Sequence, residues 1–424
     1  MKAARFHGPG DIRLDDIPEP TPQADQVLVE IEWAGICGSD LHEYIKGPFI
    51  IPTAQRPHPL TGASLPVVMG HEFCGRIAAL PKWGSGGDGG SSGGGSSGGN
   101  DSSSNNSDSP KGAGGVELEP GMKVMIDPRQ NCQSCPACSG ELRSTNLCGA
   151  WGFLGLTGCG GGFAERCAVR ADMCYVLPES VELADAALIE PLAVGRRALT
   201  QAGVGGEGEG WGGKAVLVLG GGPIGVAVLF NLKAFGAREI YVSEPTALRR
   251  KQCRGLATQV FDPRREKVAE ECRKLTNGEG VDVVIDCAGV GPAMRDGMDA
   301  LRRKGTYVNV AGWETPFELP MQYFMMKELV VRCTLAYDDA DFADTVADFL
   351  AGRYKGAEKM VTSRIAVEDI KEKGFELLVK NKDEHIKILA TPKRELLGQY
   401  QLMLSLIVAG IYVTKGKLEG GEAL

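Results

Sequence analysis

The period of the hydrophobic pattern changes near residue 193. Before that point short segments alternate apolar and polar residues, as in VLVEIEW from Val27, and glycine or proline turns separate them. This period of two predicts a mainly β domain over residues 1–192. From 193 to 334 compact apolar runs alternate with longer helical runs, and the strand-like runs begin at Lys214, Glu239, Val281, Gly305 and Leu329. Strands that alternate with helices predict an α/β fold with a doubly wound parallel sheet and crossover helices.

Residues 84–115 break both patterns. They contain no aromatic side chain and no Val, Leu, Ile or Met. Such a segment cannot bury enough apolar surface to offset its conformational entropy, so we expect a disordered surface loop between β segments at 67–79 and 116–125. Its serines leave two interpretations open, an inert insertion and a phosphorylated regulatory loop.

The composition excludes several classes of protein. A chain of 424 residues, 43% of them hydrophobic, can form the cores of two domains. A net charge of −8 and a pI near 5.4 argue against a nucleic-acid partner or a basic membrane-binding surface. The first ten residues, MKAARFHGPG, contain no apolar stretch, so we expect no secretory signal and a cytoplasmic protein. The odd count of 13 cysteines, four of them clustered, favours thiolate metal ligation over a disulfide framework.

Three residues far apart in the sequence form a candidate catalytic zinc site. Cys37 opens the stretch CGSDLH, His71 lies in GHEFCG, and Glu190 lies in IEPL. Catalytic zinc has three protein ligands from Cys, His and Asp or Glu and keeps one position open. Glu72 is a fourth candidate, either as a direct ligand or in exchange with water. A neutral alcohol does not readily release hydride, and zinc makes its ionised form accessible by lowering the pKa of a bound hydroxyl.

A second candidate zinc site lies in a compact cysteine cluster. Cys132, Cys135, Cys138 and Cys148 have the spacing C-x2-C-x2-C-x9-C. Four thiolates suit a closed tetrahedral structural zinc. The alternative is a lobe of the same shape that has lost its metal.

A glycine turn, GGGPIG from Gly220 to Gly225, predicts a dinucleotide site. It follows the strand run KAVLVLG and opens the helical run PIGVAVLFNLKAFG. In such a turn the glycines allow close approach of the pyrophosphate and packing of helix on strand. The residues expected to contact the cofactor are Gly220, Gly222, Pro223, Ile224, Gly225, Glu244, Arg249, Gly289 and Val310.

Glu244 ends the next strand run, 24 residues after Gly220. An acid at that place can accept the ribose hydroxyls and repel a 2′-phosphate, which favours NAD over NADP. Arg249 and Arg250 follow, and two interpretations stay open for them, a phosphate contact and a solvated helix face.

In combination, the two zinc motifs and the glycine turn resemble the zinc-dependent medium-chain dehydrogenase/reductase family, which includes the alcohol dehydrogenases. The resemblance covers about 1–83 and 116–390, and it is closest to the 2,3-butanediol dehydrogenases. The stretches WGFLGLTGCGGGFAE, VSEP, GTYVNVAGWE and KNKDEHIKILA carry it. Glu190, where the alcohol dehydrogenases usually have Cys, indicates the polyol and diol branch. Nine residues separate Cys138 from Cys148, which is longer than the family usually has.

The resemblance implies a GroES-like catalytic domain over 1–192, a Rossmann domain over 193–334 and a return to the first domain over 335–390. It also implies roles near the zinc. Ser39 would be the hydroxyl nearest the substrate, His42 the solvent end of a proton relay, and Asp40 the carboxylate that orients the zinc-binding histidine. Taken singly, turn capping explains Ser39 and Asp40 equally well, and a surface position explains His42.

The expected activity is the NAD-linked oxidation of a secondary alcohol or vicinal diol to a ketone, with 2,3-butanediol and acetoin as the leading pair. Oxidation of sorbitol, another polyol or threonine is the alternative, and a non-catalytic zinc and dinucleotide sensor is a further one. We expect a homodimer or homotetramer with no nucleic-acid or membrane partner. Residues 391–424 form an extension without a clear role, whose apolar segment, 402–413, is too short to span a bilayer.

Overall fold

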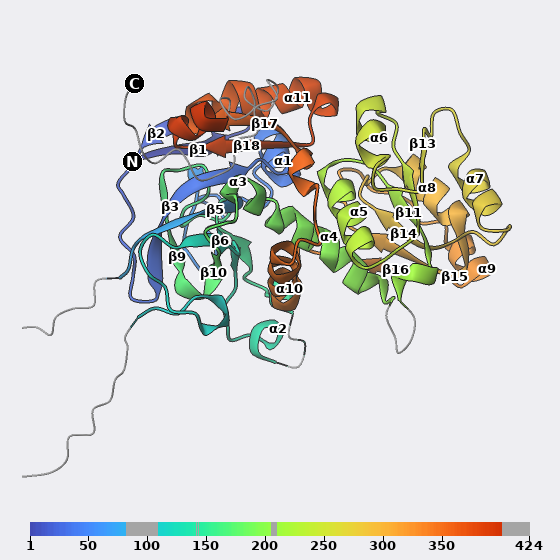
Figure 1. Cartoon of the computed structure of the whole chain (residues 1–424), viewed down its shortest axis with the longest axis horizontal. Coiled ribbons are helices and arrows are strands. Elements are labelled where there is room, and N and C mark those ends of the chain that lie inside the picture. The colour runs from blue at the N-terminus through green and yellow to red at the C-terminus, as the bar shows by residue number, and fades with distance from the viewer. Residues whose placement is uncertain (82–108, 141, 143, 205–209, 401–424) are drawn as a thin grey trace, which may run out of the picture.

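The computed structural model describes residues 1–81, 109–140, 142, 144–204 and 210–400. Two bodies lie side by side, a mainly β body and an α/β body, with helix α4 (Ile189–Ala202) between them (Figure 1). Within the described residues no helix is both long and apolar enough to cross a bilayer.

The mainly β body contains three sheets. The largest has the order β10-β6-β5-β3-β18-β17 with β9 also paired to β3, a second has the order β2-β1-β4, and β7 and β8 form a short hairpin. Its strands are β1 (Lys2–Gly8), β2 (Asp11–Asp16), β3 (Gln26–Gly35), β4 (Val67–Val68), β5 (Glu72–Ala79), β6 (Lys123–Ile126), β7 (Arg129–Gln130), β8 (Gly152–Phe153), β9 (Arg166–Arg170), β10 (Cys174–Leu177), β17 (Val361–Ala366) and β18 (Lys387–Thr391). Its short helices are α1 (Gly38–Lys46), η1 (Ala113–Gly115), α2 (Pro136–Ser139), η2 (Thr145–Leu147), η3 (Ala171–Met173) and α3 (Leu183–Ala186).

The second body is built on a six-stranded sheet in the order β13-β12-β11-β14-β15-β16, and every neighbouring pair is parallel. The predicted doubly wound α/β fold is therefore confirmed. The strands are β11 (Ala215–Leu219), β12 (Glu239–Ser243), β13 (Gln259–Phe261), β14 (Val281–Asp286), β15 (Leu301–Asn309) and β16 (Val330–Cys333). The helices are η4 (Trp211–Gly213), α5 (Pro223–Ala234), α6 (Ala247–Cys253), α7 (Val268–Leu275), α8 (Gly291–Ala300) and α9 (Met321–Lys327).

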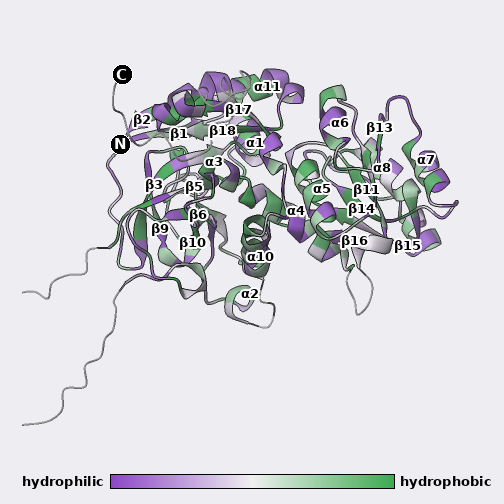
Figure 2. Ribbon diagram, in the orientation of Figure 1, coloured by the Kyte–Doolittle hydropathy of each residue, from purple (hydrophilic) through white to green (hydrophobic). Residues whose placement is uncertain are grey.

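Burial on both faces explains the apolar runs of this sheet. All residues of β11 and all α5 residues from Gly225 to Leu232 are buried, so neither element shows an amphipathic period. One core cluster lies around Val216 and Val218 on one face, and a second lies around Leu217 and Leu219 on the other. Figure 2 shows the hydrophobic colouring concentrated in α5 and the strands beside it.

The chain returns to the first sheet after β16. Strand β18 pairs antiparallel with β3 and parallel with β17. The segment also contains α10 (Asp339–Leu350), η5 (Ala357–Met360), η6 (Val367–Asp369), the π-helix η7 (Ile370–Phe375), α11 (Glu376–Asn381) and η8 (Lys382–Glu384). Helix α10 is tied to α4, because Arg197 forms ion pairs with Asp338 and Asp341.

One segment differs from the sequence-based expectations, and part of the C-terminal extension is described. Residues 84–108 of the glycine- and serine-rich segment lie outside the described residues, whereas 109–115, expected to be disordered, pack against the body. Pro110 and Gly112 are buried there, and their backbone groups bond Leu118 and Val116. Residues 394–400 of the extension are helical, and the ring of Tyr400 lies 3.7 Å from the Arg364 guanidinium, while 401–424 lie outside the described residues.

Candidate functional site

The first metal-ligand candidates meet where β3 and β5 pair. Cys37 follows β3, and His71 and Glu72 stand at the start of β5, whose Glu72 lies opposite Gly35 of β3. The ligand atoms of Cys37, His71 and Glu72 all lie within 4.8 Å of one another. The pairing of the two strands therefore brings together residues more than 30 positions apart in the sequence.

Asp40 has two contacts. One carboxylate oxygen accepts a hydrogen bond from the Cys37 backbone N–H at 2.9 Å and so caps α1. The other oxygen lies 3.4 Å from Nδ1 of His71. Burial lowers the pKa of His71, but the negative charges of Asp40 and Cys37 outweigh it and raise this pKa above its ordinary value. The capping and orienting roles considered for Asp40 are thus compatible.

Ser39 and His42 lie on α1 at increasing distance from His71. The Ser39 hydroxyl is 3.2 Å from Nε2 of His71, the nitrogen on the side away from Asp40. His42 is half-exposed, and its Nε2 lies 3.4 Å from Glu314 of the α/β body. The same Glu314 forms an ion pair with Lys46 at 2.6 Å. Helix α1 therefore runs from the candidate metal ligands to a contact between the two bodies.

Glu72 forms a buried ion pair. Lys387, the first residue of β18, places its Nζ 2.7 Å from each carboxylate oxygen of Glu72 and 3.2 Å from the Ile36 carbonyl. Both side chains are almost fully buried, at 1% and 0% exposure. A side chain at Gly35 would overlap the Glu72 carboxylate, so this position requires glycine. Glu72 is thus engaged by a cation that belongs to the protein.

Glu190 occupies the first turn of α4 and is buried, outside the group of Cys37, His71 and Glu72. The sequence placed it among the three ligands, whereas the structure places Glu72 closer to the cysteine and histidine. Burial, together with the nearby Glu72 carboxylate, raises the pKa of Glu190 to about 7. Within the described residues Glu190 makes no ion pair, in contrast to Glu72.

The four clustered cysteines lie on the cysteine lobe, defined as residues 131–151 between the hairpin strands β7 and β8. Their sulfur atoms lie within 4.8 Å of one another. Sulfurs around a tetrahedral zinc with Zn–S bonds of ~2.3 Å are separated by about 3.8 Å. The measured separations are 3.9 Å for Cys132 and Cys138 and 3.5 Å for Cys135 and Cys138. Hydrogen bonds from Ser134 and Cys135 lower the pKa of Cys132 to about 6, which favours its thiolate. The longer spacing before Cys148 still brings this cysteine to the cluster.

The glycine turn lies between β11 and α5. Gly220 has a φ of +92°, which favours glycine, and a side chain at Gly225 would overlap the Gly220 carbonyl. Gly222 caps α5, Pro223 occupies its first turn, and Ile224 follows. Free backbone N–H groups at such a helix start can bind a pyrophosphate. Gly289 and Val310 follow β14 and β15, at the same carboxyl edge of the sheet.

The Glu244 carboxylate contacts this turn directly. One oxygen accepts a hydrogen bond from the Gly221 N–H at 2.7 Å, and the other accepts from the Thr246 N–H at 2.6 Å. Each carboxylate oxygen can still accept a second bond. Arg249 has an Nη1 atom 3.7 Å from the Cβ position of Gly222, whereas Arg250 pairs with Asp262 at 3.1 Å. Of the two arginines, Arg249 is the one that faces the turn.

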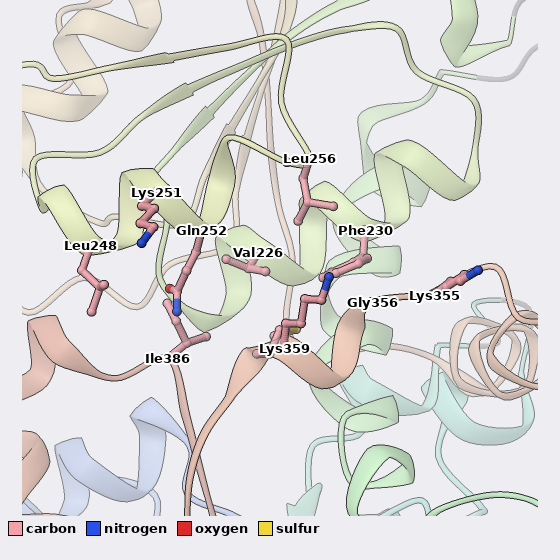
Figure 3. A pocket seen from close by; sticks show the side chains of 12 residues that line it. Val226, Phe230, Leu248, Lys251, Gln252, Leu256, Lys355, Gly356, Lys359 and Ile386 are labelled. Carbon is pink, nitrogen blue, oxygen red and sulfur yellow. The ribbon is translucent and has the colours of Figure 1, made fainter. Parts of the chain in front are cut away.

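A cavity of about 470 Å³ separates α1 from the loop after β15. Ser39, His42, Ile45, Phe49, Ile50 and Trp313 are among its lining residues. A second cavity, of about 540 Å³, lies between α5, α6 and the segment 355–360 (Figure 3). Ser39 and His42 line the first cavity and not the second, and none of the candidate metal ligands lines either cavity. The first cavity is therefore the one placed to receive a substrate.

Comparison with known proteins agrees with this geometry. The model of the alcohol dehydrogenase GroES-like domain matches residues 23–91 and 110–179, and the model of the zinc-binding dehydrogenases matches 223–352. An (R,R)-butanediol dehydrogenase from Neisseria gonorrhoeae is 36% identical, over 92% of this chain and 99% of that protein. The chain belongs to the zinc-dependent alcohol dehydrogenase family. The resemblance found in the sequence is thereby confirmed.

Solved structures of the family extend the comparison. The crystal structure of 2R,3R-butanediol dehydrogenase from Bacillus subtilis is 33% identical and has a TM-score of 0.77, covering 92% of this chain and 99% of that one. An oxidoreductase of unknown specificity from Escherichia coli is 25% identical and has a TM-score of 0.75, covering 92% and 98%. The GroES-like and zinc-binding dehydrogenase domains assign this protein to the oxidoreductases.

Three residues of the site were missed by sequence reasoning: Lys387, Glu314, and Tyr337, whose hydroxyl neighbours the Glu190 carboxylate. Lys387 lies in KNKDEHIKILA, a stretch that carried the family resemblance but gave no sign of a contact with Glu72. Tyr337 precedes an acidic run, DDADFAD, that reads only as a helix start. The one usable signal was an alternating apolar strand, IKILA, that contains a single lysine and no obvious solvent face.

Proposed function

We propose that this protein oxidises a secondary alcohol or vicinal diol to the ketone, and reduces the ketone in reverse, with zinc and NAD. The leading substrate pair is 2,3-butanediol and acetoin. The observation that carries the proposal is a cysteine, histidine and carboxylate cluster next to Ser39, which itself lines a cavity of about 470 Å³. The proposal takes residues 1–192 and 335–390 as the catalytic domain and 193–334 as the cofactor domain, with 391–424 as an extension.

The donor set fits a catalytic zinc. Sulfur, imidazole nitrogen and carboxylate oxygen are the ligands that zinc accepts. We assign Cys37, His71 and Glu190 as the ligands, because both oxygens of Glu72 are engaged by Lys387 while Glu190 makes no ion pair with a described residue. Glu72 then stays beside the metal, within reach for exchange. Cys132, Cys135, Cys138 and Cys148 would hold a structural zinc.

When bound, zinc supplies a Lewis acid that favours ionisation of the substrate hydroxyl, and NAD supplies the hydride acceptor. The protein must then remove one proton. Ser39 lies beside His71 and is placed to accept it, and His42 lies further along α1 at half exposure and is placed to pass it to water. Asp40 holds the imidazole of His71 from the opposite side.

The cavity walls favour a short diol over a polyol. Ile45, Phe49, Ile50 and Trp313 make part of the wall apolar, and the charged Lys46 and Glu314 that also line the cavity pair with each other at 2.6 Å. Glu43 also lines the cavity, but its carboxylate accepts hydrogen bonds from the backbone of Phe49 and Ile50. A sugar alcohol has a hydroxyl on every carbon, and each one buried without a partner costs free energy. 2,3-Butanediol has two methyl groups that apolar walls accommodate. Curated relatives of this chain include a sorbitol dehydrogenase from Bacillus subtilis at 27% identity, so polyols belong in the test.

NAD is proposed over NADP because of Glu244. Its buried carboxylate stands at the end of β12 and adjoins the glycine turn, where a 2′-phosphate would meet a negative charge. Arg249, which faces the same turn, is suited to the pyrophosphate. A zinc-binding dehydrogenase from Sinorhizobium meliloti, 25% identical, has been solved bound to NADP, so both cofactors need to be compared.

A second copy of the chain is the proposed partner, in a homodimer or homotetramer. Strand β16 is the edge of the parallel sheet, and all four of its residues are exposed, including Val330 and Val331. Helix α9, which precedes it in the chain, exposes Met321, Met325 and Met326. An open apolar edge strand can pair with its symmetry copy. Val331→Lys should shift the mass measured by light scattering toward the monomer, and an unchanged mass would exclude pairing through β16.

The deciding experiment is a screen of dinucleotide reduction. (2R,3R)-2,3-Butanediol, sorbitol, threonine and 2-butanol are each offered with NAD and with NADP, before and after removal of zinc. We expect the highest kcat/KM for the diol with NAD, and no turnover after zinc removal. A higher kcat/KM for sorbitol or threonine would replace the proposed substrate. A protein that binds zinc and NAD but turns over none of the four compounds would favour the sensor.

A further inference from the structure

The Tyr337 hydroxyl is a buried polar group without a partner. Tyr337 is fully buried, and its oxygen makes no hydrogen bond to a described residue. Burial, together with the charge of the neighbouring Glu190 carboxylate and its approach as a hydrogen-bond acceptor, raises the pKa of Tyr337. A buried hydroxyl without a hydrogen bond of normal geometry is energetically unfavourable. Such a group is therefore expected to gain a partner in the working state of the site.

The tyrosine is held in place by Arg129 at the base of the β7–β8 hairpin. The Arg129 guanidinium lies 4.9 Å from the centre of the Tyr337 ring and donates a hydrogen bond to the Tyr337 carbonyl at 2.9 Å. The ring of Phe342 also packs against it, with the ring centroids 5.2 Å apart. Arg129 is itself fixed by ion pairs to Asp127 and Asp339. These contacts leave the ring little freedom to turn away from Glu190.

The cysteine lobe reaches the same segment. Thr145 donates a hydrogen bond to Asp339 at 2.6 Å and accepts one from Arg129 at 2.9 Å. Asn146 donates to the Leu335 carbonyl at 2.8 Å. Both residues lie in η2, directly before the fourth cysteine of the cluster. The segment that carries Tyr337 is thus bonded at both ends to the lobe.

The other strand of the hairpin contacts His71, a candidate metal ligand. Phe153 of β8 places its ring edge-on to His71 with centroids 5.5 Å apart, and it lies 6.5 Å from the Tyr337 ring. The lobe therefore grows from a hairpin whose two strands both touch the surroundings of the candidate catalytic metal. A metal ion that closes the lobe would restrain this hairpin from outside.

We propose that Tyr337 is a positioning residue that donates its hydroxyl hydrogen bond to Glu190 when Glu190 binds the catalytic metal. We further propose that the cysteine lobe holds Tyr337 in place through Arg129, Thr145 and Asn146. The inference rests on the proposed function, because it requires Glu190 as a ligand. Partners behind the ligands commonly determine metal affinity by 10–100-fold. In this proposal the cysteine lobe stabilises the fold and also slows the loss of the catalytic metal.

The first test is Tyr337→Phe, which removes only the hydroxyl. Zinc release to a chromogenic chelator is followed over time, and the catalytic phase is identified as the one lost in Cys37→Ser. We expect this phase to become about tenfold faster or more, and we expect the rate of zinc release from the four cysteines of the lobe to stay unchanged. The ligand-field spectrum of the cobalt-substituted catalytic site should also shift. Tyr354→Phe is the matched control, since Tyr354 is buried but bonds Asn231 at 2.9 Å in another core. An unchanged rate and spectrum in Tyr337→Phe would overturn the proposal.

The second test measures coupling between the lobe and Tyr337. Cys135→Ser is made with Tyr337 intact and in Tyr337→Phe, and the catalytic release rate is compared. We expect Cys135→Ser to accelerate release several-fold when Tyr337 is present and much less in the phenylalanine variant. Equal acceleration in both backgrounds would overturn the role of the lobe. Thr145→Val, which keeps all four cysteines, repeats the test if Cys135→Ser fails to fold.

Failure of the ligand assignment gives a different result. Glu190→Gln should weaken catalytic zinc binding more than Tyr337→Phe does. If Glu190→Gln releases zinc no faster than the unaltered protein, Glu190 is not a ligand, and the proposed ligand set fails along with this inference. If only Tyr337→Phe is without effect, the ligand set stands and the positioning role of Tyr337 is overturned.

Discussion

Replacing Lys387 by methionine should destabilise the zinc-free protein much more than the zinc-loaded protein. Lys387 and Glu72 are paired at 2.7 Å and almost completely buried. Methionine has an unbranched side chain of similar length that can occupy the buried position of the lysine side chain, but it carries no charge. The change therefore leaves Glu72 as a buried carboxylate without its cation.

The size of the effect follows from this burial. Removing one partner of a buried ion pair costs about 3–5 kcal/mol, mostly because the other charge is left uncompensated. Domains of this size lose about 2–4 °C in Tm per kcal/mol, so the zinc-free variant should unfold roughly 10 °C lower. Glu72 lies within 4.8 Å of the Cys37 and His71 ligand atoms, so a zinc ion held there can replace the lost positive charge. The zinc-loaded variant should lose less than half as much.

The assay is thermal and urea unfolding of each protein with zinc and after removal by a chelator. Lys123→Met is the matched control. Lys123 is also largely buried, but it donates to the carbonyls of Glu179 and Val181 at 2.6 and 2.7 Å, away from the metal candidates. Its replacement should cost the same stability with and without zinc. If Lys387→Met loses the same stability with and without zinc, bound zinc does not compensate the charge of Glu72, and the prediction is wrong.

Four further outcomes are expected. Cys37→Ser should abolish turnover while NAD binding, measured by fluorescence titration, persists, because the dinucleotide turn lies in the other body; measurable turnover would count against the catalytic zinc. Cys135→Ser should lower the zinc content from about two ions per chain to about one and lower Tm, and unaltered metal content would exclude a structural zinc. Glu244→Ala should raise the ratio of kcat/KM for NADP to that for NAD, and a constant ratio would show that Glu244 does not reach the ribose. Burial raises the pKa of Glu190 from 4.5 to about 7, so the folded zinc-free protein keeps a proton that the unfolded chain has already released. Its free energy of unfolding should therefore fall, relative to that of Glu190→Gln, as pH rises from about 4.5 to about 7. If urea unfolding gives the two proteins the same pH dependence over this range, the expectation is wrong.

The hydrophobic period predicted most strands of the α/β body correctly. It missed one short strand there, and composition misjudged residues 109–115 of the other body. Strands β11, β12 and β14 begin within a residue of the runs read from the sequence. Strand β13 was missed because it has only three residues, Gln259–Phe261, and its pattern is too short to distinguish from a turn. Residues 109–115 were taken as disordered because they share the composition of the preceding segment. Composition could not show that Pro110 and Gly112 are buried and bonded to Leu118 and Val116, or that η1 contacts η3 and β10.

The candidate ligands were recoverable because each lies in a short motif with its own chemistry. Their relative positions were not. The sequence ranked Glu190 before Glu72, whereas the pairing of β3 with β5 places Glu72 nearer Cys37 and His71. Local patterns describe which side chains could bind a metal, but the backbone register between distant strands decides which carboxylate is close and which is engaged elsewhere.

The parts of the site that sequence reasoning missed come from the last part of the described chain. Lys387 is 315 residues from Glu72, and Tyr337 approaches Glu190 only because the segment after β16 returns to the first body. This return places a cation on one carboxylate and a hydroxyl beside the other. Under the proposed assignment, the choice of the third ligand therefore depends on residues that no motif around the metal contains.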